Sequence, residues 1–132
     1  MNAEAKDKLI LLVDDDEDFL LQTRMALEAA GYKVAPMPGM KEAEQFLTEQ
    51  RPDLVISDLM MEHMDAGFVL CHHVKKRDPT IPVILVTAVT SETGMEFEAN
   101  GDERSWIKAD ALLAKPVRIE QLKREINRLL EG

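Results

Sequence analysis

The chain has 132 residues, about the length of one globular domain, and a domain of this size needs neither a disulfide nor a metal to fold. Its 25 acidic and 16 basic residues give a formal charge of −9, which disfavours nucleic acid and anionic membranes as partners. The single cysteine, Cys71, excludes an internal disulfide. No apolar run approaches the roughly 18 residues of a membrane span, and the polar start lacks a signal-peptide core. We therefore expect a cytoplasmic protein whose residues 1–8 form a flexible segment.

The first predicted elements are a strand and a helix joined by acidic residues. Leu9–Val13 is a short unbroken apolar run, which is typical of a strand buried on both faces. Five acids follow at Asp14–Asp18, and Asp16 can cap the helix that comes next. Gly31 supplies the left-handed residue at which this helix ends. The inward positions of the helix fall on one face: Phe19, Leu20, Thr23 and Leu27.

The same unit of strand and helix then repeats along the chain. The further predicted strands are short: Lys33–Pro36, Leu54–Ser57, Val83–Thr87 and Ala111–Ala114. The further predicted helices have apolar residues at helical spacing: about Met40–Gln50, a helix between the loop Met60–Asp65 and Asp78-Pro79, and Ile119–Leu129. This alternation predicts one domain over residues 1–132, with an α/β fold built on a doubly wound, five-stranded parallel sheet. The expected strand order is the flavodoxin-like 2-1-3-4-5, with helices on both faces.

Charged and polar residues follow the predicted strands, at the edge where the carboxyl ends of parallel strands lie together. These residues are Asp14, Asp15 and Asp16 after the first strand, Asp58 after the third, Thr87 at the end of the fourth and Lys115 after the fifth. Two like charges about 4 Å apart repel by roughly 4 kcal/mol at an effective dielectric constant of about 20, so the gathered carboxylates need a cation. Oxygen ligands at an open site favour Mg²⁺ over zinc, which prefers His and Cys ligands.

A magnesium site beside a carboxylate, a lysine and a hydroxyl is suited to phosphoryl transfer. In this interpretation the carboxylate of Asp58 is the nucleophile. Mg²⁺ and Lys115 balance charge on the equatorial oxygens of the transferring group, and the Thr87 hydroxyl donates a hydrogen bond to one of them. The sequence thus predicts that Asp58 is phosphorylated.

Over nearly its whole length the chain resembles the response-regulator receiver domains of bacterial two-component signalling. The resemblance rests on four segments in the same order: LLVDDD at 11–16, PDLVISDLMM at 52–61, PVILVTA at 82–88 and AKP at 114–116. It implies that Asp58 accepts a phosphoryl group from a sensor histidine kinase or a phosphotransfer protein. It also implies self-catalysed transfer and slow autodephosphorylation, which make a phosphoacceptor rather than a conventional enzyme.

The resemblance further implies roles for neighbouring residues. Asp15 and Asp58 would bind Mg²⁺ directly, Asp14 would act largely through water, and the backbone carbonyl of Met60 would complete the protein ligands. The bond before the proline of this motif is often cis in the family, so we expect a cis peptide bond in Lys115-Pro116.

Three departures from the family pattern change these expectations. The segment Met61–Ala66 lacks the proline and both glycines that the family commonly has there, so we expect a reshaped loop beside the phosphoacceptor. The spacing from Thr87 to Lys115 is longer than usual, so we expect a remodelled fourth helix within Ser91–Asp110. Leu112 stands where the family often places an aromatic residue that reports phosphorylation, so that switch is expected to be absent or altered.

Our leading interpretation is a stand-alone phosphoacceptor without an output segment. Its signal would pass, through a surface that changes when Asp58 is modified, to an unidentified protein or to a second copy in a homodimer. A phosphatase with an aspartyl nucleophile usually needs a second acid two residues on, where Met60 stands. A flavin or nucleotide site needs glycines and free amides where Asp14–Asp18 lie. A receiver-like interaction module that is independent of phosphorylation stays open, and its partner binding would be indifferent to Asp58→Ala and to Mg²⁺.

Overall fold

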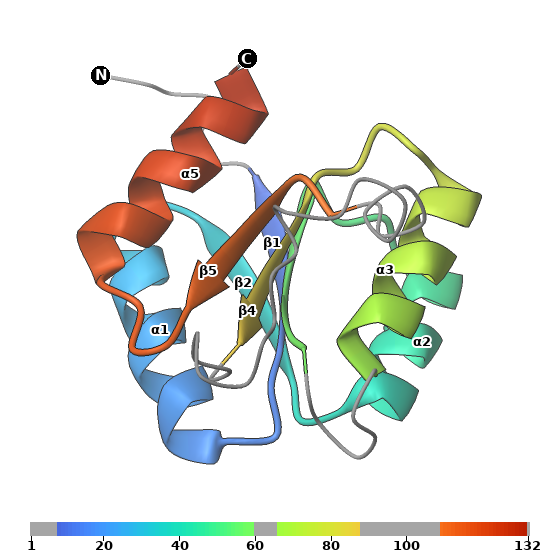
Figure 1. Ribbon diagram of the computed structural model, residues 1–132, viewed down its shortest axis with the longest axis horizontal. Coiled ribbons are helices and arrows are strands. Elements are labelled where there is room, and N and C mark those ends of the chain that lie inside the picture. Colours follow the sequence, from blue (N-terminus) through green and yellow to red (C-terminus); the bar gives the residue numbers. More distant parts are fainter. Residues whose placement is uncertain (1–7, 60–65, 88–108, 132) are drawn as a thin grey trace.

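The computed structural model describes residues 8–59, 66–87 and 109–131. Within these ranges strands and helices alternate from β1 to β4, and β5 and α5 follow (Figure 1). The strands are β1 (Leu9–Val13), β2 (Lys33–Met37), β3 (Leu54–Asp58), β4 (Val83–Thr87) and β5 (Ala111–Ala114). The helices are α1 (Glu17–Ala29), α2 (Met40–Glu49), α3 (Ala66–Arg77) and α5 (Ile119–Glu131).

The five strands form one parallel sheet in the order β2-β1-β3-β4-β5. Strand β3 lies at the centre, with Ile56 paired to Leu12 of β1 and to Ile84 of β4. The order reverses between β1 and β3, which is where open α/β sheets place their ligands. The predicted fold class, a doubly wound flavodoxin-like sheet with this strand order, is confirmed.

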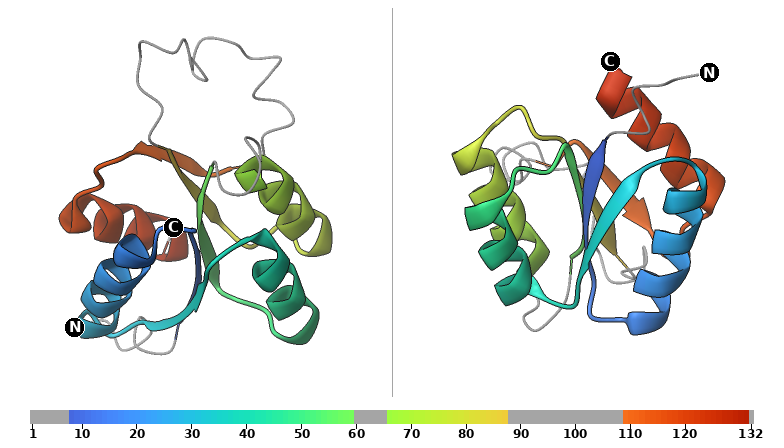
Figure 2. Two further views of the ribbon diagram at one scale, coloured as in Figure 1. Left: turned by 90° about the horizontal axis from the view of Figure 1, so that it is seen from below. Right: turned by 180° about the vertical axis from the view of Figure 1, so that it is seen from behind.

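The sheet has a hydrophobic core on each face, because successive strand residues point to opposite sides. Helices α1 and α5 cover one face, and α2 and α3 cover the other (Figures 1 and 2). The buried residues of the first core are Ile10, Leu12, Leu20, Leu27, Tyr32, Leu54, Ile56, Ile84, Val86, Leu113, Leu122 and Ile126. Those of the second are Leu11, Val13, Ala43, Leu47, Val55, Leu59, Leu70, Cys71, Val74, Ile81, Val83 and Leu85. The central strands are therefore apolar on both sides, as their unbroken apolar runs predict.

Helix α1 begins and ends at the residues that the sequence indicates. Asp16 is its N-cap, and Asp16 Oδ1 accepts hydrogen bonds from the backbone N–H groups of Asp18 and Phe19 at 3.0 and 3.3 Å. Two further acids in the first turn favour the positive end of the helix dipole. Gly31 has φ 105°, the left-handed conformation that glycine adopts readily and that turns the chain toward β2.

Several element ends differ from the predicted ones because sheet pairing sets them. Strand β2 continues to Met37, which pairs with Val13, and β3 continues to Asp58, which pairs with Val86. Asp58 is thus the last residue of a strand rather than the first of a loop. Three segments lie outside the described residues: 1–7, the expected reshaped loop at 60–65, and 88–108. The last of these includes positions 91–108 of the expected remodelled region.

Lys75 and Asp110 form an ion pair at the amino ends of the strands. Lys75 Nζ donates hydrogen bonds to Asp110 Oδ2 at 2.8 Å and to the carbonyl of Ile81 at 2.7 Å. Asp110 Oδ2 also accepts from the backbone N–H of Val83 at 2.8 Å. The pair therefore ties α3 to the starts of β4 and β5.

Arg51 and Asp78 form a second ion pair at the same edge, with Nε 2.6 Å from Oδ2. Arg51 also donates to the hydroxyl of Thr80 at 3.1 Å. Nearby, Asp53 Oδ2 accepts from the backbone N–H of Leu9 at 2.8 Å, which joins the starts of β1 and β3. We call Lys75–Asp110 and Arg51–Asp78 the amino-edge ion pairs.

Cys71 lies on the inner face of α3 and is 1% exposed. Its burial raises the pKa of the thiol to about 11, so the reactive thiolate is scarce at neutral pH. This agrees with its predicted role as a small core residue. Within the described part of the chain, no helix has both the length and the apolar character required to cross a membrane.

Candidate functional site

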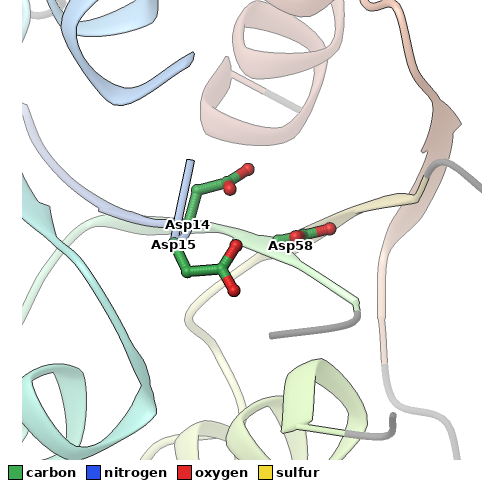
Figure 3. A group of neighbouring side chains, drawn as sticks. All are labelled: Asp14, Asp15 and Asp58. Carbon is green, nitrogen blue, oxygen red and sulfur yellow. The ribbon is translucent and has the colours of Figure 1, made fainter. Parts of the chain in front are cut away.

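Three aspartates meet at the carboxyl ends of two neighbouring strands. Asp14 and Asp15 follow β1, and Asp58 is the last residue of β3 (Figure 3). One carboxylate oxygen from each residue lies within 4.8 Å of those from the other two. Asp14 is 0% exposed and Asp58 7%, whereas Asp15 is exposed. The cluster, which we call the aspartate cluster, is therefore reached from solvent on the side of Asp15.

Lys115 adds a positive charge to the aspartate cluster from the end of β5. Its Nζ donates a hydrogen bond of 2.9 Å to Asp14 Oδ2 and lies 3.8 Å from Asp58 Oδ2. The same ammonium lies 4.6 Å from the centroid of the Phe19 ring, within the range of a cation–π contact. Lys115 is thus placed by an acid on one side and by an aromatic ring on the other.

Burial and neighbouring charges set the pKa values of Asp14 and Lys115. Burial raises the pKa of Asp14, and the charge of Asp15 raises it further, although hydrogen bonds from Lys115 and from the backbone N–H of Asp16 oppose them. Burial alone would lower the pKa of Lys115, but its hydrogen bond to Asp14 and the charges of Asp14, Asp58 and Asp16 raise it overall. The lysine stays charged, and a further cation would relieve the repulsion between the carboxylates.

Thr87 lies at the same edge, as the last residue of β4. Its neighbour Val86 pairs with Asp58, and Thr87 is 5% exposed. The carbonyl of Thr87 accepts the backbone N–H of Lys115 at 2.7 Å, and the bond in Lys115-Pro116 is cis, as predicted. Met60, the predicted carbonyl ligand, lies outside the described residues. The chemical roles of all these residues stay predictions.

The structure also places residues at the site whose contacts the sequence analysis did not predict. Phe19 was predicted only as an inward position of α1, and the spacing of apolar residues gives no sign of its contact with Lys115. Ser57 and Gly67 contact the main chain of Asp58. The available signal for Gly67 is a glycine in the first turn of a helix, where alanine has the higher intrinsic propensity.

The donor set of the aspartate cluster fits a small, hard divalent cation. Its three side chains offer only oxygen atoms, and one of them is exposed, so such an ion could keep several waters. The raised pKa of Asp14 reflects a carboxylate whose burial is incompletely compensated by Lys115. The cluster could therefore hold a metal ion.

A family model described as the response regulator receiver domain matches residues 10–127 of the chain. Because this match covers most of the sequence, the chain belongs to the response regulator receiver domain family, the phosphoacceptor family of two-component systems. The resemblance on which the sequence analysis relied is confirmed.

Individual relatives agree with this assignment. The probable transcriptional regulator ycf27 of Guillardia theta is 30% identical over 136 residues, which cover 98% of the chain and 48% of the relative. A CheY-like receiver domain protein from Methanospirillum hungatei superimposes with a TM-score of 0.79 at 26% identity, covering 94% of each chain. The response regulator TrrA of Thermotoga maritima, solved in complex with Mg(2+)-BeF, has a TM-score of 0.76 at 26% identity, covering 93% of this chain and 99% of that one.

The chain spans half or less of the length of the curated relatives it matches, for example 48% of ycf27 and 34% of AfsQ1 of Streptomyces coelicolor. Several of these relatives are named as transcriptional regulators. The sequence-based exclusion of nucleic acid as a partner is therefore not supported. The net charge of this chain describes only its own residues, and it gives no information about a DNA-binding region elsewhere in a longer protein.

Proposed function

We propose that the chain is a Mg²⁺-dependent phosphoacceptor that takes a phosphoryl group on Asp58. The donor would be the phosphohistidine of a sensor histidine kinase or of a phosphotransfer protein. The observation that carries the proposal is the convergence of Asp14, Asp15 and Asp58 within 4.8 Å beside the ammonium of Lys115. Among the described residues, no comparable set of contacts favours a second function.

The transfer follows from the chemistry of the side chains. An oxygen of the Asp58 carboxylate attacks phosphorus, the new O–P bond forms as the N–P bond of the donor breaks, and the donor histidine keeps the electron pair. Lys115, already 3.8 Å from Asp58 Oδ2, stabilises negative charge on the transferring group. The hydroxyl of Thr87 donates a hydrogen bond to an oxygen of the new phosphoryl group. The product is therefore held by two side chains from strand ends beyond β3.

Asp14, Asp15 and Asp58 would hold Mg²⁺, with the backbone carbonyl of Met60 as a further ligand. A bound Mg²⁺ supplies charge neutralisation at the phosphoryl oxygens. Asp15 is the exposed member of the cluster, so it can exchange water for the ion without unfolding its surroundings. Asp14 is buried and bonded to Lys115, which suits a contact through water rather than a direct one.

The signal would leave through a surface near Asp58. Phosphorylation adds close to two negative charges at the aspartate cluster, which already carries excess acid. The added charge draws Lys115 and Thr87 toward Asp58 and alters the affinity for a downstream protein or for a second copy. We further propose that the chain acts as one receiver domain in the cytoplasm.

The deciding experiment is phosphorylation by a small donor. The protein is incubated with acetyl phosphate with and without Mg²⁺, and intact-mass spectrometry follows a base-labile gain of one phosphoryl group. We expect the gain only with Mg²⁺, mapping to Asp58 and absent in Asp58→Asn. Asp18→Asn is the matched control, because it removes an exposed acid of the same segment that lies outside the aspartate cluster.

A failure to label Asp58 under these conditions would contradict the proposal. If partner binding were also unchanged by Asp58→Ala and by removal of Mg²⁺, the chain would act as an interaction module that is independent of phosphorylation.

A further inference from the structure

The first turn of α3 lies directly against the main chain that follows Asp58. A Cβ atom built on Gly67 would lie 2.4 Å from the carbonyl oxygen of Asp58 and 2.6 Å from Cα of Leu59. Both distances are far below van der Waals contact, and both neighbours are backbone atoms that cannot rotate away. Position 67 therefore has room for hydrogen and for no larger group.

The same carbonyl is held by a buried hydroxyl. Ser57 is 0% exposed, and its Oγ donates a hydrogen bond of 2.9 Å to the carbonyl oxygen of Asp58. Strand β1 pairs with β3 only as far as Val13 opposite Ser57, so the described β1 ladder stops one residue before Asp58. A side chain of β3 itself thus supplies a donor to this carbonyl.

The peptide unit after Asp58 is also fixed at Leu59. The backbone N–H of Leu59 donates to the carbonyl of Val86 at 2.7 Å, and its carbonyl accepts from the N–H of Gly67 at 2.8 Å. The Asp58–Leu59 segment therefore contacts β4 through one hydrogen bond and α3 through another. With the contact of Ser57, its position is determined from three directions.

We propose that Ser57 and Gly67 are positioning residues that hold the main chain of Asp58 so that its carboxylate faces Asp15 and Lys115. The proposal rests on the phosphoacceptor function proposed above. The carboxylate carbon of Asp58 is only two bonds from its Cα. A displacement of the Asp58 main chain therefore moves the carboxylate as well. Reactions of this kind lose rate steeply when reacting atoms are misplaced by about 1 Å.

The direction of the stability change in Gly67→Ala tests the proposal. In an unobstructed helix, alanine is more stable than glycine, so the substitution would stabilise α3. At position 67 the methyl group must instead push α3 and the Asp58 carbonyl apart. We expect a lower melting temperature, weaker Mg²⁺ binding and at least tenfold slower phosphorylation of Asp58 by acetyl phosphate.

Ser57→Ala is the milder second variant, since it removes one hydroxyl and leaves the fold intact. We expect a several-fold loss of phosphorylation rate at saturating Mg²⁺. Thr48→Ala is its matched control, because Thr48 Oγ1 also donates to a backbone carbonyl, that of Gln45 at 2.7 Å, on the exposed side of α2. Ala66→Gly is the control for Gly67→Ala, because it makes the reverse change in the same helical turn.

The Mg²⁺ dissociation constant, from NMR titration of the folded protein, separates positioning from stability. If Ser57→Ala and Gly67→Ala lower only the melting temperature and leave the Mg²⁺ constant and the rate of the folded protein at the control values, the inference is overturned and the phosphoacceptor proposal stands. If the unchanged protein neither binds Mg²⁺ nor labels Asp58, both proposals fail together. If Gly67→Ala does not fold, the Ser57→Ala and Thr48→Ala pair decides.

Discussion

The two edges of the sheet differ in how far cations neutralise their acidic side chains. At the amino edge Lys75 pairs with Asp110 at 2.8 Å. Arg51 pairs with Asp78 at 2.6 Å and lies 3.8 Å from Asp53. At the carboxyl edge Asp14 and Asp58 share Lys115, and Asp15 brings a third carboxylate within 4.8 Å. The amino edge thus has two cations for three acids, whereas the carboxyl edge has one cation for three acids and a larger excess of negative charge.

The difference indicates which edge stabilises the fold and which one is kept for a ligand. Matched ion pairs and hydrogen bonds to strand ends lower the free energy of the folded state. Gathered like charges raise it, and a protein retains them where function requires them. Four predictions test this difference. A change at the amino edge should lower stability, whereas a change at the carboxyl edge should affect the chemistry or relieve the repulsion between carboxylates.

Lys115→Ala should have the largest effect. Removing the ammonium leaves the charge of the transferring group without its side-chain partner, so the phosphorylation rate of Asp58 should fall about 100-fold. Initial rates with acetyl phosphate at saturating Mg²⁺ measure it. Lys41→Ala, an exposed lysine on α2, is the control and should react as the unchanged protein does. An undiminished rate in Lys115→Ala would remove the lysine from the proposed chemistry.

Asp110→Ala should lower stability and leave the phosphorylation rate unchanged, the reverse of the expectation for Lys115→Ala. It removes the acceptor for Lys75 and for the N–H of Val83, so the free energy of unfolding should fall by about 2 kcal/mol. Urea denaturation measures the loss, and the phosphorylation rate of the folded protein should not change. Lys75→Met tests the same pair, and the two substitutions together should cost less than their sum. Simple additivity would mean that the two side chains do not interact.

Asp14→Asn should stabilise the protein in the absence of Mg²⁺, by about 1 kcal/mol, because it removes one of three repelling charges. The pKa of Asp14 is raised, so its charge costs stability once the pH exceeds the ordinary value of 3.8, and the gain should vanish below that pH. Mg²⁺ should stabilise the unchanged protein by about 1.4 kcal/mol per tenfold excess over its dissociation constant, and the variant less. Melting curves of both proteins in Mg²⁺ and in EDTA measure this. An equal rise of the melting temperature with Mg²⁺ in the two proteins would contradict the prediction.

Asp78→Asn should have the smallest effect. Hydrogen bonds from the side chains of Thr80 and Arg51, and from the backbone N–H of Thr80, lower the pKa of Asp78 from 3.8 to about 2. The charged form therefore stabilises the fold above pH 3.8, and this contribution is lost as the pH falls toward 2. Urea midpoints of the two proteins should differ slightly at neutral pH and converge near pH 2. A difference that persists at that pH would place its cause elsewhere.

The strand order and the gathering of polar residues at one edge were predictable from sequence. Apolar runs such as Leu9–Val13 have few alternatives to a buried strand, and parallel strands must bring their carboxyl ends together. The acids after β1 and Asp58 therefore had to lie near one another, whatever their roles. Hydrophobic period and topology carry this information, and neither depends on details of side-chain packing.

The contacts of single side chains were not predictable in the same way. The partner of Lys75 is Asp110, which lies 35 positions away in the sequence, and spacing alone does not single it out. The sequence analysis found both family glycines missing from the segment Met61–Ala66, whereas the position with no room for a side chain is Gly67, one residue later. A shift of one residue at the start of α3 decides which position needs glycine, and only the packing of helix on strand sets that shift.

Because Cys71 is buried, its reactivity can report how often α3 separates from the sheet. The thiol is the sole sulfhydryl in the sequence, it lies on the inner face of α3, and its pKa of about 11 keeps it protonated. A maleimide or a mild oxidant can reach it only when that helix lifts from the sheet. The labelling rate of this single sulfur would therefore measure how often the helix that contacts the Asp58 main chain opens, without an introduced cysteine.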